Sequence, residues 1–190
     1  MELAEKEERE LICIDESIFS SKSNKRKQWA PIGSALEWDK RFQNDKWVAV
    51  CAASSVKSGM VHYTTLLKEA YTTKTFMKFM RALHNKCSKK SIAILIDNCG
   101  IHDHKTPEFI EYCDKRDIVI IWNIKYRPDL NGIEFVWKWA KKEYRSWVDW
   151  FRANGMNWNE TQLVEIIMDS IPTDVAVKET KRGFANIKAA

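Results

Sequence analysis

The sequence predicts an α/β fold built on a mixed five-stranded sheet flanked by helices. Three apolar runs come first, the last two of them joined by turn-like residues. Two more runs follow helical stretches, and a long amphipathic helix comes after the last run. Strands joined by short turns pair antiparallel, whereas strands reached through a helix pair in parallel. The order strand-strand-strand-helix-strand-helix-strand-helix therefore predicts a sheet that contains both kinds of pairing.

The five predicted strands are apolar runs rich in β-branched and aromatic residues. They are LICIDESIF (11–19), WVAVCAAS (47–54), GMVHYTTL (59–66), SIAILID (91–97) and DIVIIWN (117–123). The turn-forming residues SVKSG join the second run to the third, which predicts a hairpin at this point.

The predicted helices carry apolar residues at a spacing of three or four, and Pro107 suits the first turn of the second helix. They cover residues 72–87, 106–116, 133–147 and 159–171. A polar break, FRANGMNW, covers 151–158. The sequence VKETKRGFANIKAA (177–190) is a basic tail to which the pattern assigns no role.

We expect one compact domain at 11–150, an acidic lead-in at 1–10 and a helical and basic extension at 151–190. A chain of 190 residues, 45% hydrophobic and 30% charged, is typical of a soluble globular protein. Its five cysteines are scattered and odd in number, which favours a reducing, intracellular environment: the nucleus of a eukaryote, or the cytoplasm and nucleoid of a bacterium. No apolar run approaches the ~18 residues of a membrane span, so we expect neither a signal peptide nor a membrane helix.

Three acidic residues are the main candidates for chemistry: Asp15 and Asp97, each at the end of an apolar strand, and Glu134 near the start of the long helix. A buried carboxylate is costly unless it is hydrogen-bonded, paired or bound to a metal. Singly, the two aspartates could end their strands, and Asn131-x-x-Glu134 matches a capping box. Together, three converging acids predict a site for Mg²⁺ or Mn²⁺. Two such ions ~4 Å apart activate water and stabilise the leaving oxygen of a phosphodiester.

Basic residues follow Glu134 along its predicted helix, next to an apolar face that contains Trp137. This basic stripe consists of Lys138, Lys141, Lys142 and Arg145. A second basic group lies between the first two strands, at Lys25, Arg26, Lys27 and the neighbouring Trp29. Both groups suit the phosphates of a nucleic acid, and the alternatives are a solvated helix face and a tryptophan that closes a small satellite core.

Four segments resemble motifs of one family. These are ICIDES (12–17), KRKQWAPIGS (25–34), LIDNCGIHDHK (95–105) and YRPDLNGIEFVWKWAKKEYR (126–145). In this order they are similar to the first-aspartate strand, the following loop, the second-aspartate segment and the SPDLNPIE signature of the mariner superfamily of DDE transposases and related bacterial insertion-sequence transposases. The similarity covers roughly residues 11 to 150.

The resemblance implies an RNase H-like, retroviral-integrase-like fold in which Asp15, Asp97 and Glu134 are catalytic and bind two Mg²⁺ or Mn²⁺ ions. The implied activity is that of a metal-dependent DNA endonuclease and strand transferase, which cleaves transposon ends and joins the 3′-hydroxyl to a TA-containing target. The implied partners are DNA and, when active, a second copy of the chain, without a membrane or a small-molecule cofactor. Gly132 replaces the usual proline before the glutamate, and we expect it to loosen the entry to the helix.

Three further polar residues lie beside these acids: Asn98, His102 and Asn131. We expect them to orient the metal ligands or a phosphate, although a structural hydrogen bond explains Asn98 and His102 equally well. Glu16 follows Asp15 directly and should face the opposite side of the sheet.

Two other functions remain open from the sequence: a recruited, non-catalytic subunit that binds DNA or protein, and a nuclease for RNA:DNA hybrids. Members of the family carry N-terminal helix-turn-helix modules, whereas this chain begins about ten residues before its first strand. It is therefore either a catalytic domain taken from a longer chain or the product of a shortened gene. Without such modules we expect DNA binding mainly through phosphates, with little sequence choice.

Overall fold

The protein is seen here in a computed structural model that describes residues 8–21, 32, 46–87, 91–100 and 106–189. Within these residues the strands are β1 (Glu10–Ser20), β2 (Trp47–Ser55), β3 (Gly59–Leu67), β4 (Ile92–Ile96) and β5 (Ile118–Trp122). The helices are α2 (Thr73–Lys86), α3 (Pro107–Asp114), the 3₁₀ turn η4 (Pro128–Leu130), α4 (Ile133–Ala153), α5 (Glu160–Asp169) and α6 (Thr173–Ala189). Each predicted strand is present, with bounds within one residue of the prediction.

The strands form one sheet in the order β3-β2-β1-β4-β5. The pairs β1/β2 and β2/β3 are antiparallel, and β1/β4 and β4/β5 are parallel, which confirms the predicted mixed sheet. The predicted hairpin joins β2 to β3, where Gly59 has φ +73°, a left-handed conformation that suits glycine. β1 lies at the centre of the sheet.

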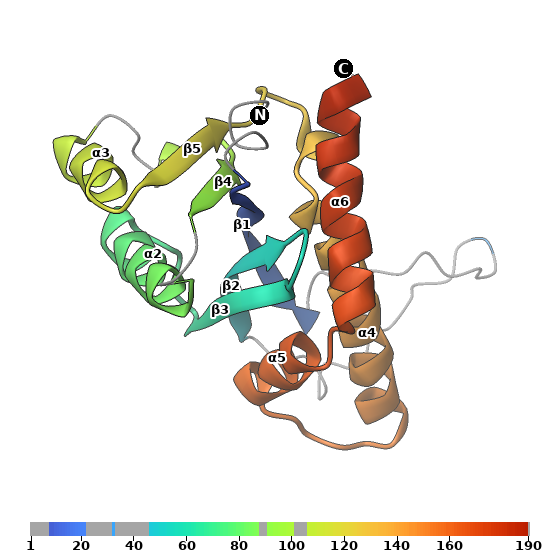
Figure 1. Ribbon diagram of the computed structural model, residues 1–190. Helices are drawn as coiled ribbons and strands as arrows, with labels where there is room; N and C mark the ends of the chain where they lie inside the picture. The colour runs from blue at the N-terminus through green and yellow to red at the C-terminus, as the bar shows by residue number, and fades with distance from the viewer. Residues whose placement is uncertain (1–7, 22–31, 33–45, 88–90, 101–105, 190) are drawn as a thin grey trace.

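Helices cover both faces of the sheet (Figure 1). On one face α2 and α3 pack against a core that includes Ile12, Ile14 and Phe76. On the other face α4, α5 and α6 pack against a core that includes Cys13 and Trp137. Because successive residues of a strand point to opposite faces, β1 contributes apolar side chains to both cores.

The C-terminal part of the chain departs most from the prediction. α4 continues to Ala153, past the expected helix end at about Trp147. The basic tail is most of the helix α6, which begins at Thr173 and places Ala176 and Phe184 in the core. Residues 151–189 therefore complete one face of the sheet. Within the described part of the chain, no helix has the length and apolar character needed to cross a membrane.

Candidate active site

The strand register brings the two aspartates together, as the sequence predicts. The last pair between β1 and β4 is Cys13 with Leu95, so two residues further along, Asp15 and Asp97 stand at matching positions on neighbouring strands. Neighbouring strands are about 4.8 Å apart. Asp97 directly follows the end of β4, where its Oδ1 accepts a hydrogen bond from the Cys99 backbone N–H at 3.0 Å.

Glu134 lies in the first turn of α4, and that turn is fastened to β1. The Asn131 side chain donates to the Ile14 carbonyl oxygen at 3.1 Å. The Trp137 indole N–H, one turn after Glu134, donates to Asp15 Oδ2 at 3.2 Å. The capping-box interpretation is wrong: α4 has Gly132 as its N-cap, without a capping side chain, and Asn131 bonds to β1 instead. The Glu134 carboxylate is therefore not used to cap its own helix.

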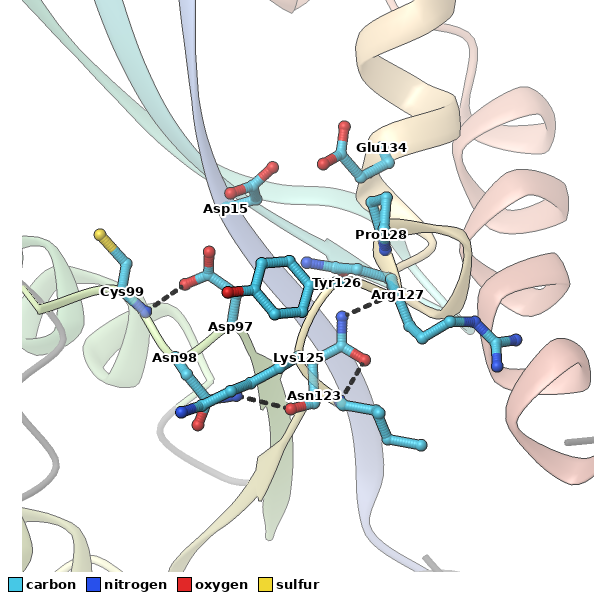
Figure 2. Close-up of a pocket in the computed structure, with 12 residues that line it drawn as sticks. Asp15, Asp97, Asn98, Cys99, Asn123, Lys125, Tyr126, Arg127, Pro128 and Glu134 are labelled. Carbon is cyan, nitrogen blue, oxygen red and sulfur yellow. Dashed lines mark hydrogen bonds between the residues drawn. The ribbon is translucent and has the colours of Figure 1, made fainter.

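All three acids line one open pocket of about 490 Å³. Figure 2 shows the carboxylates of Asp15, Asp97 and Glu134 around this pocket, from β1, from the end of β4 and from α4. Two residues after β4 and the segment between β5 and α4 form the rest of the wall. The remaining lining residues are Asn98, Cys99, Asn123, Ile124, Lys125, Tyr126, Arg127, Pro128 and Asn131.

The acids raise one another's affinity for protons. Burial, followed by the charges of Glu134, Glu16 and Asp97, raises the pKa of Asp15 from 3.8 to about 8. Partial burial also raises the pKa of Glu134, with Asp97 acting in the same direction and the nearby Lys141 lowering it. A cation in this pocket would offset the repulsion.

The donor set fits a hard divalent cation. Carboxylate oxygens are the ligands that Mg²⁺ and Mn²⁺ prefer. In addition, Asn131 lines the pocket, and its buried Oδ1 has no hydrogen-bond partner. Among the described residues, no three Asp, Glu, His or Cys side chains lie close enough to form a complete metal-binding group. Mg²⁺ does not require one, because it commonly uses one or two carboxylates and completes its shell with water and substrate phosphate.

The other predicted site residues fall into two groups. Asn98 donates from its side chain to the Asn123 carbonyl oxygen at 2.6 Å, so it braces the ends of β4 and β5, which is the structural alternative. Asn131 lies close to Asp15, because its side chain donates to the carbonyl oxygen of the preceding residue, Ile14. His102, Lys25, Arg26, Lys27 and Trp29 lie outside the described residues.

The basic stripe has the predicted arrangement on α4. Lys138, Lys142 and Arg145 are exposed, and Lys141 is half-buried and acts electrostatically on Glu134. The adjoining apolar face is buried, also as predicted, at Ile133, Trp137, Ala140 and Tyr144. The stripe thus leads away from the pocket along the outside of the helix.

The sequence assigns no role at the site to Lys125, Tyr126 and Arg127, although the last two begin the motif at 126–145 and all three line the pocket. Tyr126 is 97% exposed and has φ +63°, a conformation that costs a non-glycine residue energy and that recurs at functional sites. The loop that carries these residues is nevertheless braced, because Asn123 donates to the Arg127 carbonyl oxygen at 3.0 Å. Arg127 itself pairs with Asp129 and points away from the acids (Figure 2). An exposed ring at the lip of an acidic pocket leaves no trace in hydrophobic periodicity.

Gly132 does not loosen the helix entry. Its φ of −60° is an ordinary helical value, and a Cβ atom at this position would lie 2.5 Å from the Thr180 carbonyl oxygen of α6. Glycine is therefore needed here for close packing between α4 and α6 and not for backbone freedom.

The fold and the sequence together identify the class of protein. The sheet order and the helices on its two faces are those of an RNase H-like domain. The family model described as DDE superfamily endonuclease matches residues 10–152, and the chain belongs to this family. A comparison with curated proteins found no match.

Solved structures with a similar fold include the Mos1 transposase catalytic domain, the Mos1 strand transfer complex and a viral intasome. The Mos1 transposase catalytic domain with raltegravir and Mn gives a TM-score of 0.67 at 10% identity, covering 98% of this chain and 84% of that one. The Mos1 strand transfer complex gives 0.64 at 13% identity, covering 98% of this chain. A simian T-cell lymphotropic virus intasome gives 0.52 at 15% identity, covering 84% of this chain and 47% of that one. This chain spans 56% of the Mos1 chain in the strand transfer complex.

Proposed function

We propose that this domain is the catalytic domain of a DDE transposase, which cleaves DNA with Mg²⁺ or Mn²⁺ held by Asp15, Asp97 and Glu134. The observation that carries the proposal is the meeting of these three acids at one open pocket in a chain of the DDE endonuclease family. We further propose two ions, cleavage at transposon ends, transfer of the 3′-hydroxyl to a TA-containing target, and a homodimer as the active form.

Each residue has a separate task in this proposal. Bound divalent ions would supply a nucleophilic water and neutralise the charge that develops on the leaving oxygen. Asp15 on β1 and Asp97 just after β4 would hold the ions, and the hydrogen bond from the Trp137 indole N–H fixes the orientation of Asp15. Glu134 closes the pocket from α4. Because the pKa of Asp15 is about 8, this carboxyl must lose its proton before it can act as a ligand.

The DNA would enter along the exposed cations. Lys138, Lys142 and Arg145 lie on the solvent side of α4 and can neutralise phosphates on the way to the pocket. At the lip, Lys125 adds a further exposed cation and Tyr126 an uncovered ring on which a base can stack. These contacts recognise phosphate charge and the faces of bases, so they provide affinity for DNA with little sequence specificity.

The experiment is the substitution Glu134→Gln, tested for Mn²⁺-dependent nicking of duplex DNA and for melting temperature on the same preparation. We expect nicking to fall by about two orders of magnitude or more because a charged ligand is lost. The melting temperature should hold or rise slightly, since one of the repelling charges is gone. The matched control is Glu143→Gln. Glu143 lies on the opposite side of α4 from Glu134, so this variant should nick DNA like the wild type.

Two outcomes would contradict the proposal. If the wild type nicks DNA and Glu134→Gln nicks it equally well, Glu134 is not a ligand. If the wild type neither nicks DNA nor gains thermal stability from millimolar Mg²⁺ or Mn²⁺, the domain is not a metal-dependent nuclease. If an RNA:DNA hybrid is cut in preference to duplex DNA, the substrate is a hybrid and the three acids remain the proposed site.

A further inference from the structure

The start of α4 is in backbone contact with α6, at a pair of glycines. A Cβ atom at Gly183 would lie 2.2 Å from the backbone nitrogen of Gly132 and 2.5 Å from its Cα. A Cβ atom at Gly132 would in turn lie 2.6 Å from the Thr180 Cα. Real Cβ atoms essentially never approach other atoms below 3.0 Å, so neither position accepts a side chain without movement. Gly132 is two residues before Glu134.

Other contacts fix α6 on both sides of this glycine pair. The Asn186 side chain donates to the Asp129 carbonyl oxygen at 2.8 Å, which holds η4 just before α4 begins. The buried Thr180 hydroxyl lies 2.6 Å from the Ser54 hydroxyl on β2, which holds α6 to the sheet. The Arg182 guanidinium lies 4.3 Å from the centre of the Phe135 ring, in the first turn of α4.

The position of Glu134 consequently depends on two neighbours of its helix turn. On one side is β1, through the bonds of Asn131 and Trp137 already described. On the other side is α6, because no side chain caps α4 and the turn rests directly on Gly183. A backbone-to-backbone contact sets a distance more sharply than a contact between flexible side chains, which can adjust their rotamers.

We propose that α6 is the positioning element for Glu134, and that Gly183 and Asn186 are its positioning residues. This inference rests on the function proposed above for Glu134. It assigns a role to a helix that lies beyond the matched family segment at residues 10–152. Neither Gly183 nor Asn186 lines the pocket, so any effect on metal binding must travel through the start of α4.

The substitution that tests this most directly is Gly183→Ala. Restoring an ordinary contact of 3.4 Å from 2.2 Å requires a shift of about 1 Å between α6 and α4, and a misplacement of that size can cost about a hundredfold in rate. Helix propensity acts in the opposite direction, since alanine is a better helix former than glycine. A loss of metal affinity would therefore come from the contact and not from a weakened helix.

Two quantities are measured: amide hydrogen exchange in the metal-free protein, and the affinity of the protein for Mn²⁺. In EDTA, amide hydrogen exchange of residues 131–137 should become faster in Gly183→Ala than in the wild type. By calorimetry, the Mn²⁺ Kd should rise about tenfold or more, as for other residues that orient ligands. The control is Lys181→Ala, an exposed residue of the same helix, which should change neither quantity.

Asn186→Ala is the second variant, and it carries the test if Gly183→Ala does not fold. We expect the same two changes with a smaller size, because one hydrogen bond is lost without a clash. A folded variant of either kind with unchanged exchange at 131–137 and an unchanged Mn²⁺ Kd would overturn the proposal, even if its melting temperature were lower. If the wild type itself binds no Mn²⁺, the proposed function fails, while the exchange data still decide whether α6 holds the start of α4.

Discussion

The substitution Asp15→Asn should stabilise the metal-free protein, and the gain should grow with pH. In the folded state burial, with the charges of Glu134, Glu16 and Asp97, raises the pKa of Asp15 from 3.8 to about 8. Between these two values the unfolded chain has released this proton while the folded chain keeps it. Folding therefore takes up a proton, and the wild type loses stability as the pH rises through this window.

The size of the effect follows from the two pKa values. Each pH unit between 3.8 and about 8 costs the wild type about 1.4 kcal/mol, which sets an upper limit of about 4 kcal/mol at pH 7. Asp15 keeps part of its surface in contact with the open pocket, so solvent screens its charge and we expect about 2 kcal/mol. Above pH 8 the difference should stay constant. Asparagine retains an oxygen that accepts the Trp137 indole N–H, so the packing is preserved.

The assay is urea unfolding in EDTA from pH 5 to pH 8, for wild type and variant. The control is Asp117→Asn, because its hydrogen bond to Arg9 lowers the pKa of Asp117 and its titration lies below this window. Asp117→Asn should therefore give a curve parallel to the wild type. Adding Mn²⁺ should stabilise the wild type, by about 2.7 kcal/mol at a hundredfold excess over Kd, and stabilise Asp15→Asn much less. Parallel curves for wild type and Asp15→Asn would refute the claim that this carboxyl holds a proton at neutral pH.

Two further predictions concern DNA binding. Replacing Lys138, Lys141 and Lys142 with alanine should weaken DNA binding about equally for unrelated sequences. The slope of log K against log salt concentration, measured by fluorescence anisotropy, should become flatter by up to ~0.9 per lost phosphate contact. An unchanged slope would mean that the stripe faces only solvent. Tyr126→Gly should raise the free energy of unfolding by up to about 1 kcal/mol, since glycine accepts φ +63°. It should also weaken single-strand binding by roughly fivefold or more through lost stacking, and equal affinity would exclude a base at this ring.

The sheet could be predicted because each strand carries its own signal. The apolar runs of β1 and β4 identify them as strands within one residue of their observed ends. The helical crossovers make β3, β4 and β5 run in the same direction, and β1 runs in that direction too because β2 is antiparallel to both β1 and β3. The place of β4 beside β1 comes from the observed sheet order. Asp15 lies in the middle of β1 and Asp97 just after β4, so the approach of the two aspartates follows from the parallel register of these neighbouring strands.

The placement of Glu134 could not be predicted in the same way. Asn131 and Glu134 have the spacing of a capping box, and only the structure shows that the Asn131 amide bonds to β1 instead. In the helical pattern, Trp137 is simply one residue of the apolar face of α4. A buried indole N–H needs an acceptor, however, and in the structure this acceptor is Asp15. Local pattern identifies the face that is buried but not the atoms that it meets there.

The contact between Gly132 and Gly183 explains why the sequence does not predict the role of the C-terminal tail. Most of its residues favour a helix, but the tail contains a glycine, which is usually unfavourable inside a helix. In the structure that glycine has a reason, because any larger residue would collide with the start of α4. A residue that looks destabilising in its own helix can therefore be required by a partner 51 positions away in the sequence. The cost to the helix of about 1 kcal/mol is small beside the loss that a displaced Glu134 would cause at the pocket.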